Sequence, residues 1–122
     1  ELALGKVIRI VTDEWANPTY IPELSASIVD LVSGSREGVF HIAGRYFLAR
    51  FEMVIAVCEQ FGLSPDLVRP VVSGDLGQDA ARPPRAGLKI DKIWTTFGRS
   101  YESFRDNLAS IAEQLDRWWP AN

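Results

Sequence analysis

The chain has 122 residues, of which 47% are hydrophobic and 24% are charged, proportions typical of a soluble globular domain with a modest core. A formal net charge of −3 without any basic run argues against a nucleic-acid-binding surface, which needs clustered lysine and arginine. No apolar stretch approaches the ~20 residues of a membrane-spanning helix and no signal peptide is visible, so we expect no membrane partner and a cytoplasmic location. The chain begins at Glu1 rather than at a methionine, as expected of a piece of a longer protein.

The first third of the sequence predicts a strand, a helix and a second strand. Residues 7–12 are β-branched and mostly apolar, which favours a covered strand, and residues 13–19 follow as a loop. A helix begins near Pro22, a residue suited to the first helical turn, and ends at residues 33–35. Its expected apolar face consists of Leu24, Ile28, Leu31 and Val32. The apolar segment 39–43 is the second predicted strand, and this order of elements predicts a parallel crossover unit.

The middle of the chain predicts a second, longer helix. Five apolar side chains recur at helical spacing and lie on one stripe: Phe47, Phe51, Val54, Cys58 and Phe61. Gly62 is well placed as the C-cap of this helix, and residues 64–66 favour one further short helical turn. Residues 69–87 hold several prolines and glycines, so we expect no regular element there. A loop of that length in a compact domain is usually functional or disordered.

Two helices are predicted after this loop, a short one at residues 91–97 and a last one from about Ser100 to Trp118. The apolar face of the last helix consists of Phe104, Leu108, Ile111, Leu115 and Trp118. The predicted fold class is therefore α/β, with short parallel strands and three main helices. Two strands form a poor sheet without neighbours, so dimerisation or strand exchange is an expected alternative to folding alone.

Four segments in a fixed order resemble the motifs of one protein family. Residues 11–20 read Val-Thr-Asp-Glu-Trp-Ala-Asn-Pro-Thr-Tyr, residues 38–44 read Gly-Val-Phe-His-Ile-Ala-Gly, and residues 50–53 read Arg-Phe-Glu-Met. The fourth segment is Ala-Arg-Pro at residues 81–83, followed by Leu88, Asp91 and Lys92. Together they are similar to the dTDP-4-dehydrorhamnose reductase family of extended short-chain dehydrogenase/reductases. Each motif alone is weak, but their shared order and spacing span nearly the whole chain.

The resemblance implies that residues 1–122 form the C-terminal substrate-binding portion of a Rossmann-type fold, without the N-terminal NAD(P)-binding part. It implies a parent enzyme of dTDP-rhamnose biosynthesis that reduces dTDP-4-keto-6-deoxysugars with NADP or NAD as the cofactor. The family's Gly-rich turn is not found in this sequence, and no tyrosine is followed four residues later by lysine. We therefore expect no catalytic residue, no cofactor-binding residue and no cofactor in this piece, which alone should be inactive.

Five residues are the candidate substrate contacts: Asn17, Pro18, Thr19, Arg82 and Pro83. The first three follow the carboxyl end of a predicted parallel strand, where ligands bind in open α/β sheets, although a rigid turn explains them equally well. Arg82 suits phosphate oxygens through its planar fork, or it ties the long loop to a carboxylate such as Asp79. The sequence departs from the family at Glu14, Ala16 and Arg85, where Gln, Gly and Asn are usual, which leaves the exact substrate open.

The remaining residues of chemical interest are better explained by structure. Trp15 is more readily a packing anchor than a stacking surface. His41 is the only histidine and lies between apolar neighbours without a catalytic partner. Cys58 is the only cysteine, so no internal disulfide can form, and its place on an apolar stripe predicts a buried inert thiol. With one His and one Cys, no zinc site is expected. Trp118 and Trp119 either cap the core or form an exposed apolar patch.

Two functional hypotheses follow for this chain. In the first it binds a nucleotide sugar as part of a reductase, with the N-terminal half or a second copy as its protein partner. In the second it is a non-catalytic regulatory or interaction module of the same fold, as some relatives of the family are. Upstream sequence, or a titration with dTDP, distinguishes the two.

Overall fold

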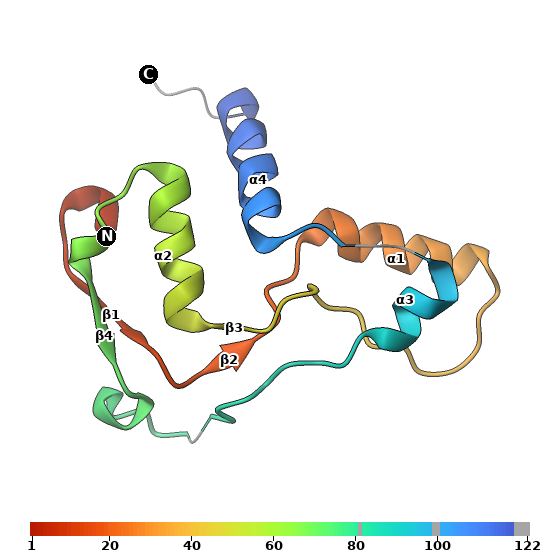
Figure 1. Ribbon diagram of the computed structural model, residues 1–122, viewed down its shortest axis with the longest axis horizontal. Coiled ribbons are helices and arrows are strands. Elements are labelled where there is room, and N and C mark those ends of the chain that lie inside the picture. Colours follow the sequence, from red (N-terminus) through yellow and green to blue (C-terminus); the bar gives the residue numbers. More distant parts are fainter. Residues whose placement is uncertain (81, 99–100, 119–122) are drawn as a thin grey trace.

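The structure is a computed structural model and describes residues 1–80, 82–98 and 101–118, with side chains described as far as residue 115. The molecule is elongated, with two lobes at opposite ends (Figure 1). One lobe, here called the sheet lobe, holds a parallel strand pair covered by helix α2. The other, the helical lobe, holds α1, α3 and the chain between α1 and the next strand. Helix α4 stands between the two lobes and contacts α2.

The sheet lobe is built on two parallel strands that lie far apart in the sequence. Strand β1 (Ile8–Val11) pairs with β4 (Val68–Val71) in the register Ile8 to Val68 and Val11 to Val71. Val11 and Val68 are the buried residues of the pair, and α2 (Arg50–Phe61), which contacts both strands, fills the crossover between them. The predicted first strand is confirmed. The parallel crossover predicted from residues 7–43 is wrong, because the parallel partner of β1 is β4 and not residues 39–43.

The predicted strand at residues 39–43 is wrong. This segment runs as irregular extended chain, because Phe40, Ile42 and Ala43 insert into an apolar cluster instead of joining a ladder. The prediction of an irregular stretch from residue 69 is also wrong, since this stretch contains most of β4 and a short 3-10 helix at Ser73–Leu76. Pro70 is tolerated in β4 because a two-stranded sheet has only edge strands.

Helix α2 confirms the predicted helix, but Phe47, the first residue of the predicted apolar stripe, lies before the helix begins at Arg50. Cys58 is fully buried, as expected of an inert core thiol. The carboxylate of Glu52 accepts a hydrogen bond from the backbone N–H of Ala49 at 2.8 Å, which satisfies a free donor at the N-terminus of the helix. The helix ends at Gly62, whose φ of 64° is the left-handed conformation that glycine adopts readily. The predicted short turn follows as a 3-10 helix at Pro65–Leu67.

The helical lobe is centred on α1 (Ile21–Ser33) and α3 (Asp91–Phe97), whose predicted positions are confirmed. Its core is a cluster of four buried residues, Ala43, Ile90, Ile93 and Tyr101, against which Leu31, Phe40, Ile42, Trp94 and Phe97 pack. The apolar face predicted for α1 is only partly correct, because Ile28 is 48% and Val32 is 76% exposed. The helix instead turns Ser27 inward, where its hydroxyl meets that of Tyr101.

The last helix, α4 (Phe104–Trp118), begins later than predicted. Ser103 caps it, because its hydroxyl accepts the backbone N–H of Asp106 at 3.1 Å while its own N–H donates to the Asp106 carboxylate. Leu108 is buried, but Leu115 is 48% exposed. The side chain of Trp118 and the whole of Trp119 lie outside the described residues. Among the helices of the described chain, none is long and apolar enough to cross a membrane.

Candidate functional site

A short antiparallel ribbon links the two lobes and organises the candidate site. Strand β2 (Trp15–Ala16), which lies within the predicted loop 13–19, pairs with β3 (Leu48–Ala49). The other side of Trp15 is held by the segment that follows residue 82: its N–H donates to the carbonyl of Pro84 at 2.8 Å, and its carbonyl accepts the N–H of Ala86 at 2.9 Å. This pairing brings the predicted contacts Arg82 and Pro83 beside Glu14 and Trp15.

The side chains of Asn17 and Thr19 form hydrogen bonds with the backbone of other segments of the chain. The Asn17 side-chain amide donates to the carbonyl of Gly44 and accepts the N–H of Leu88, both at 2.9 Å. The Thr19 hydroxyl donates to the carbonyl of Asn17 and accepts the N–H of Gly44. A Cβ placed on Gly44 would lie 1.8 Å from the carbonyl oxygen of Pro18, so only glycine fits there. Asn17 and Thr19 thus connect the segment at residues 17–19 to the backbone at Gly44 and Leu88.

Four of the five predicted contacts line two separate depressions, and Asn17 lines neither. Pro18 and Thr19 line an apolar one of about 410 Å³ between the start of α1 and α4, here called the helix hollow. Arg82 and Pro83 line another of about 450 Å³, together with Trp15, Met53 and Val54, here called the indole hollow. A third depression of about 200 Å³, the strand hollow, is lined by Arg9 and Gln78 among others. Glu14, Arg50 and Arg82 line both the indole hollow and the strand hollow, so these two meet at the three side chains.

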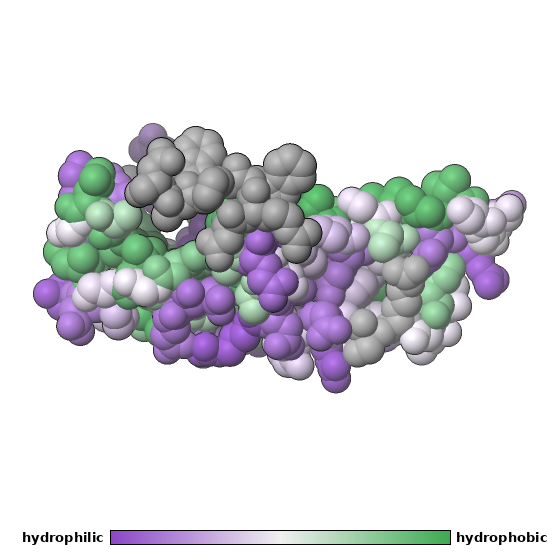
Figure 2. Space-filling model, turned by 90° about the horizontal axis from the view of Figure 1, so that it is seen from above, coloured by the Kyte–Doolittle hydropathy of each residue, from purple (hydrophilic) through white to green (hydrophobic). Residues whose placement is uncertain are grey.

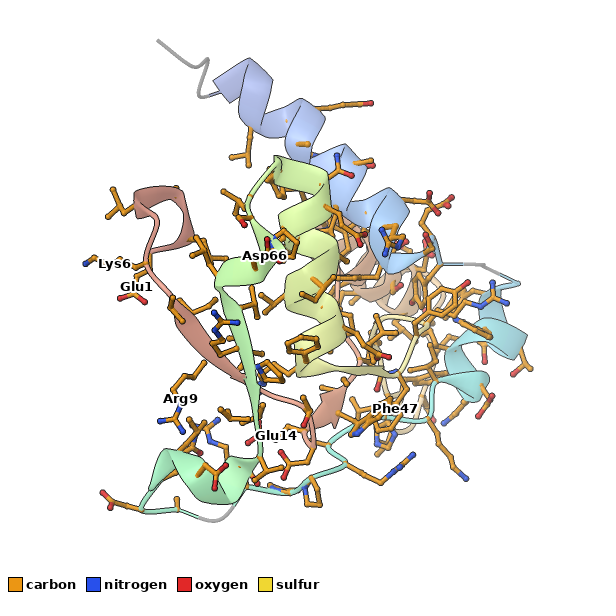
Figure 3. All side chains as sticks on the ribbon, turned by 60° about the vertical axis from the view of Figure 1, so that its left-hand side comes forward. Glu1, Lys6, Arg9, Glu14, Phe47 and Asp66 are labelled. Atoms are coloured by element: carbon orange, nitrogen blue, oxygen red, sulfur yellow. The ribbon has the colours of Figure 1, made fainter. Side chains whose placement is uncertain are left out.

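Positive charge dominates the place where the two hollows meet. Three guanidinium groups, those of Arg9, Arg50 and Arg82, line the hollows against the single carboxylate of Glu14. Glu14 is only 7% exposed, and its Oε2 lies 3.3 Å from Nε of the half-exposed Arg50. In Figure 3, Glu14 lies near the carboxyl end of β1, between Arg9 and Phe47 in that view. The arrangement can attract an anion and pair it with planar N–H forks.

The aromatic wall of the site is fixed by stacking. The rings of Trp15 and Phe47 lie 5.8 Å apart at an interplanar angle of 28°, and the guanidinium of Arg85 lies 5.1 Å from the Phe47 ring and 5.9 Å from the Trp15 ring. Such cation–π contacts hold Arg85 over the pair. Trp15 is therefore a packing anchor, as predicted, and it also lines the indole hollow.

The remaining predictions concern His41, a metal site and the partner of Arg82. His41 is exposed, and the described residues contain no group of His, Cys, Asp and Glu that could hold a metal ion. Arg82 and Asp79, both among the described residues, form no ion pair. Sequence reasoning missed Arg9 and Arg50 as site residues. In the sequence, Glu14 stands out only as a departure from the family motif. No local pattern predicts that residues 9, 14, 50 and 82 line adjoining hollows.

Known proteins resemble this chain in sequence. A family model described as "RmlD substrate binding domain" matches residues 2–117. The dTDP-4-dehydrorhamnose reductase of Mycolicibacterium smegmatis is 34% identical over an alignment that covers 90% of this chain and 36% of that protein. The probable low-salt glycan biosynthesis reductase Agl14 of Haloferax volcanii is 26% identical, with coverage of 90% and 37%. The chain thus spans a little over a third of the length of these relatives.

Solved structures agree on the fold. The dTDP-4-dehydrorhamnose reductase of Bacillus anthracis, crystallised with NADP, superposes with a TM-score of 0.84 at 21% identity, over 93% of this chain and 40% of that one. The enzyme of the same name from Yersinia enterocolitica superposes with a TM-score of 0.77 at 21% identity, over 91% and 39%. The predicted α/β fold class, as part of an extended short-chain dehydrogenase/reductase fold, is confirmed.

Proposed function

This chain belongs to the RmlD substrate-binding domain family, and from this premise we propose that it is the substrate-binding part of an NAD(P)-dependent reductase of dTDP-4-keto-6-deoxysugars. Relatives that match it are named dTDP-4-dehydrorhamnose reductase and dTDP-4-keto-6-deoxy-D-glucose reductase. The proposed ligand is accordingly a dTDP-linked deoxysugar, and the proposed process is dTDP-rhamnose biosynthesis in the cytoplasm.

The observation that carries the proposal is the arginine-lined junction of the indole and strand hollows. A nucleotide sugar combines a flat base, a diphosphate and a polar ring. Arg9 and Arg82 supply planar donors for phosphate oxygens, and the indole hollow supplies an apolar wall. Pro83 lines the same hollow, while Pro18 and Thr19 line the helix hollow. Asn17 takes the role of a positioning residue that ties residues 44 and 88 to the ribbon.

The residues of this chain do not fit a dinucleotide. A pyrophosphate site of that kind needs a Gly-rich turn between a strand and the open N-terminus of a helix. Helix α1 begins with Ile21 and Pro22, and at α2 the Glu52 carboxylate already accepts the free N–H of Ala49. We therefore propose that NADP or NAD binds to another part of the parent protein, and that hydride transfer takes place on residues outside this chain.

A titration of the natural gene product with dTDP tests the proposal. We expect saturable binding by calorimetry, and roughly tenfold weaker binding after Arg82→Ala, because one charge-assisted contact to the diphosphate is lost. Thymidine, which lacks the diphosphate, should bind the wild type and Arg82→Ala equally. Arg105→Ala is the matched control, since it removes an exposed arginine that pairs with Glu59 on the far side of α2. No binding of dTDP by the folded protein would rule the proposal out.

A second candidate function, a non-catalytic interaction module, is favoured by one observation. The side chains of Ile21, Val29 and Val32 on α1 are 60–76% exposed, and Figure 2 shows hydrophobic surface at the end of the molecule where α1 lies. The mass of the natural product in a source lysate separates the candidates. A band near 13.6 kDa favours the module, and a band two to three times larger favours the reductase.

A further inference from the structure

Residues 39–43 have the properties of a strand without a partner. Val39 and His41 are exposed, whereas the alternate residues Phe40 and Ile42 are partly buried and pack against the apolar cluster of the helical lobe. Such alternation is the period-two pattern of a strand with one covered face. Among the described residues, no backbone N–H or C=O of the last four residues of this segment bonds to another backbone group. An extended segment of this kind can accept a further strand at its open edge.

The sequence of this segment is nearly symmetric about its central histidine. Between Gly38 and Gly44, the order of a smaller aliphatic residue, a large apolar residue and histidine reads the same from both ends: Val39, Phe40, His41, Ile42 and Ala43. One position further out, Glu37 and Arg45 have opposite charges, and both are exposed. Two copies of such a segment are complementary in an antiparallel pair, because each residue then faces its mirror position. A parallel strand from elsewhere in the parent protein would give no reason for this symmetry.

Hydrogen bonds already present leave one edge of the segment open. The carbonyl of Val39 accepts a hydrogen bond from Nζ of Lys92 at 2.7 Å, and successive residues of a strand direct their backbone groups to opposite edges. The edge opposite to this bond carries the backbone groups of Phe40 and Ile42. It ends at Gly44, whose N–H and C=O are already bonded within the chain. Two residues on each copy suffice for a short ladder, because each facing pair exchanges two hydrogen bonds.

We propose that residues 39–43 pair with the same residues of a second copy of the chain, antiparallel and with the two His41 side by side. Glu37 then faces the second copy's Arg45 at both ends of the contact, which adds two cross-strand pairs of opposite charge. Val32 of α1, which is 76% exposed, lines a depression of about 300 Å³ together with Phe40. Apolar surface of the helix therefore adjoins the contact. The inference concerns assembly and does not depend on the identity of the ligand.

A disulfide introduced into the natural gene product tests the register. The facing His41 residues form a non-hydrogen-bonded pair, whose Cα atoms lie about 4.5 Å apart, within the reach of a disulfide. We expect His41→Cys to give a covalent dimer under mild oxidation, measured by non-reducing electrophoresis. Glu37→Cys is the matched control, since its two copies would lie about 27 Å apart. The wild type, whose Cys58 is buried, should stay uncrosslinked. A yield from His41→Cys no higher than that from Glu37→Cys would overturn the inference.

An exchange of charges tests the contact without cysteine chemistry. Glu37→Arg should weaken dimerisation roughly tenfold in sedimentation equilibrium, because two pairs of like charge replace two pairs of opposite charge. Adding Arg45→Glu to this variant should restore the association of the wild type. Asp66→Arg is the matched control, because it reverses an exposed acidic residue in the sheet lobe and should leave dimerisation unchanged.

Three results of sedimentation would contradict the pairing. They are a natural gene product that sediments only as a monomer, a dimer that Glu37→Arg does not weaken, and a double variant that stays as weak as Glu37→Arg. A strand of the parent protein that covers the segment would give the first of these. The titration with dTDP measures the proposed function separately, so either proposal can fail while the other stands.

Discussion

The sheet lobe and the helical lobe are held together by different kinds of contact. In the sheet lobe, a parallel strand pair in the register Ile8 to Val68 and Val11 to Val71 is covered by one long helix. In the helical lobe, a seven-residue helix and an irregular segment meet around Ile93 and Tyr101. The sheet lobe has a backbone ladder that persists when a side chain is lost, whereas the helical lobe depends on its apolar cluster and on side-chain hydrogen bonds such as that between Ser27 and Tyr101.

The largest expected effect therefore comes from the centre of the helical lobe. Ile93 is 2% exposed, and Ile93→Ala should destabilise the protein by about 3 kcal/mol through lost burial and the cavity that remains. Urea unfolding measures the total effect, and hydrogen exchange measures where it acts. We expect the amides of α3 to lose protection while those of α2 keep theirs. Equal loss in both helices would show that the two lobes unfold as one unit. Val29→Ala, at a position 60% exposed on α1, should change stability by less than ~0.5 kcal/mol.

The second largest effect is expected at the junction between the two lobes. Gly44→Ala forces a Cβ toward the carbonyl of Pro18 and should cost about 2 kcal/mol, since backbone cannot give way as a side chain does. It should also weaken dTDP binding, because Asn17 and Thr19 both bond to Gly44. Gly74→Ala is the control, with no atom within 4 Å of the new Cβ. If the two variants have the same urea midpoint of unfolding, the close approach at Gly44 does not affect the stability of the protein.

The smallest effect is a pH dependence in the sheet lobe. The Ser73 hydroxyl donates to Asp13 at 2.8 Å, and this bond, assisted by the Ser73 N–H, holds the pKa of the Asp13 carboxyl below its ordinary value. The folded state thus favours ionised Asp13, which adds stability above the unfolded pKa of ~3.9 and loses it as the pH falls through the folded pKa. Asp13→Asn should remove this part of the acid sensitivity. Wild type and variant are compared by urea midpoints between pH 7 and pH 2.5, and parallel curves would contradict the assignment.

The same contrast explains which elements could be predicted from the sequence. Helix α2 carries an apolar stripe and a C-cap glycine, Gly62, and the predicted range 91–97 coincides with α3, so both predicted helices are confirmed. Residues 39–43 have the composition of a strand but no strand beside them, and their apolar side chains pack in a cluster. Strand β4 was not predicted because it contains Pro70, and proline is a poor strand residue except at the edge of a sheet.

For the candidate site, the sequence alone determined the family, by four motifs in order, and named Arg82 and Pro83 beside the loop at residues 17–19. The motifs can be recognised without a structure, because the residues of each motif are close in sequence and keep a fixed spacing. Only the tertiary structure decided that Pro18 and Thr19 line one hollow and Arg82 and Pro83 another. It also decided that Asn17 and Thr19 form hydrogen bonds with the backbone of residues 44 and 88, and that Glu14 pairs with Arg50. The physical reason is that burial and pairing depend on contacts across 27 to 71 residues of sequence separation, which no local pattern encodes.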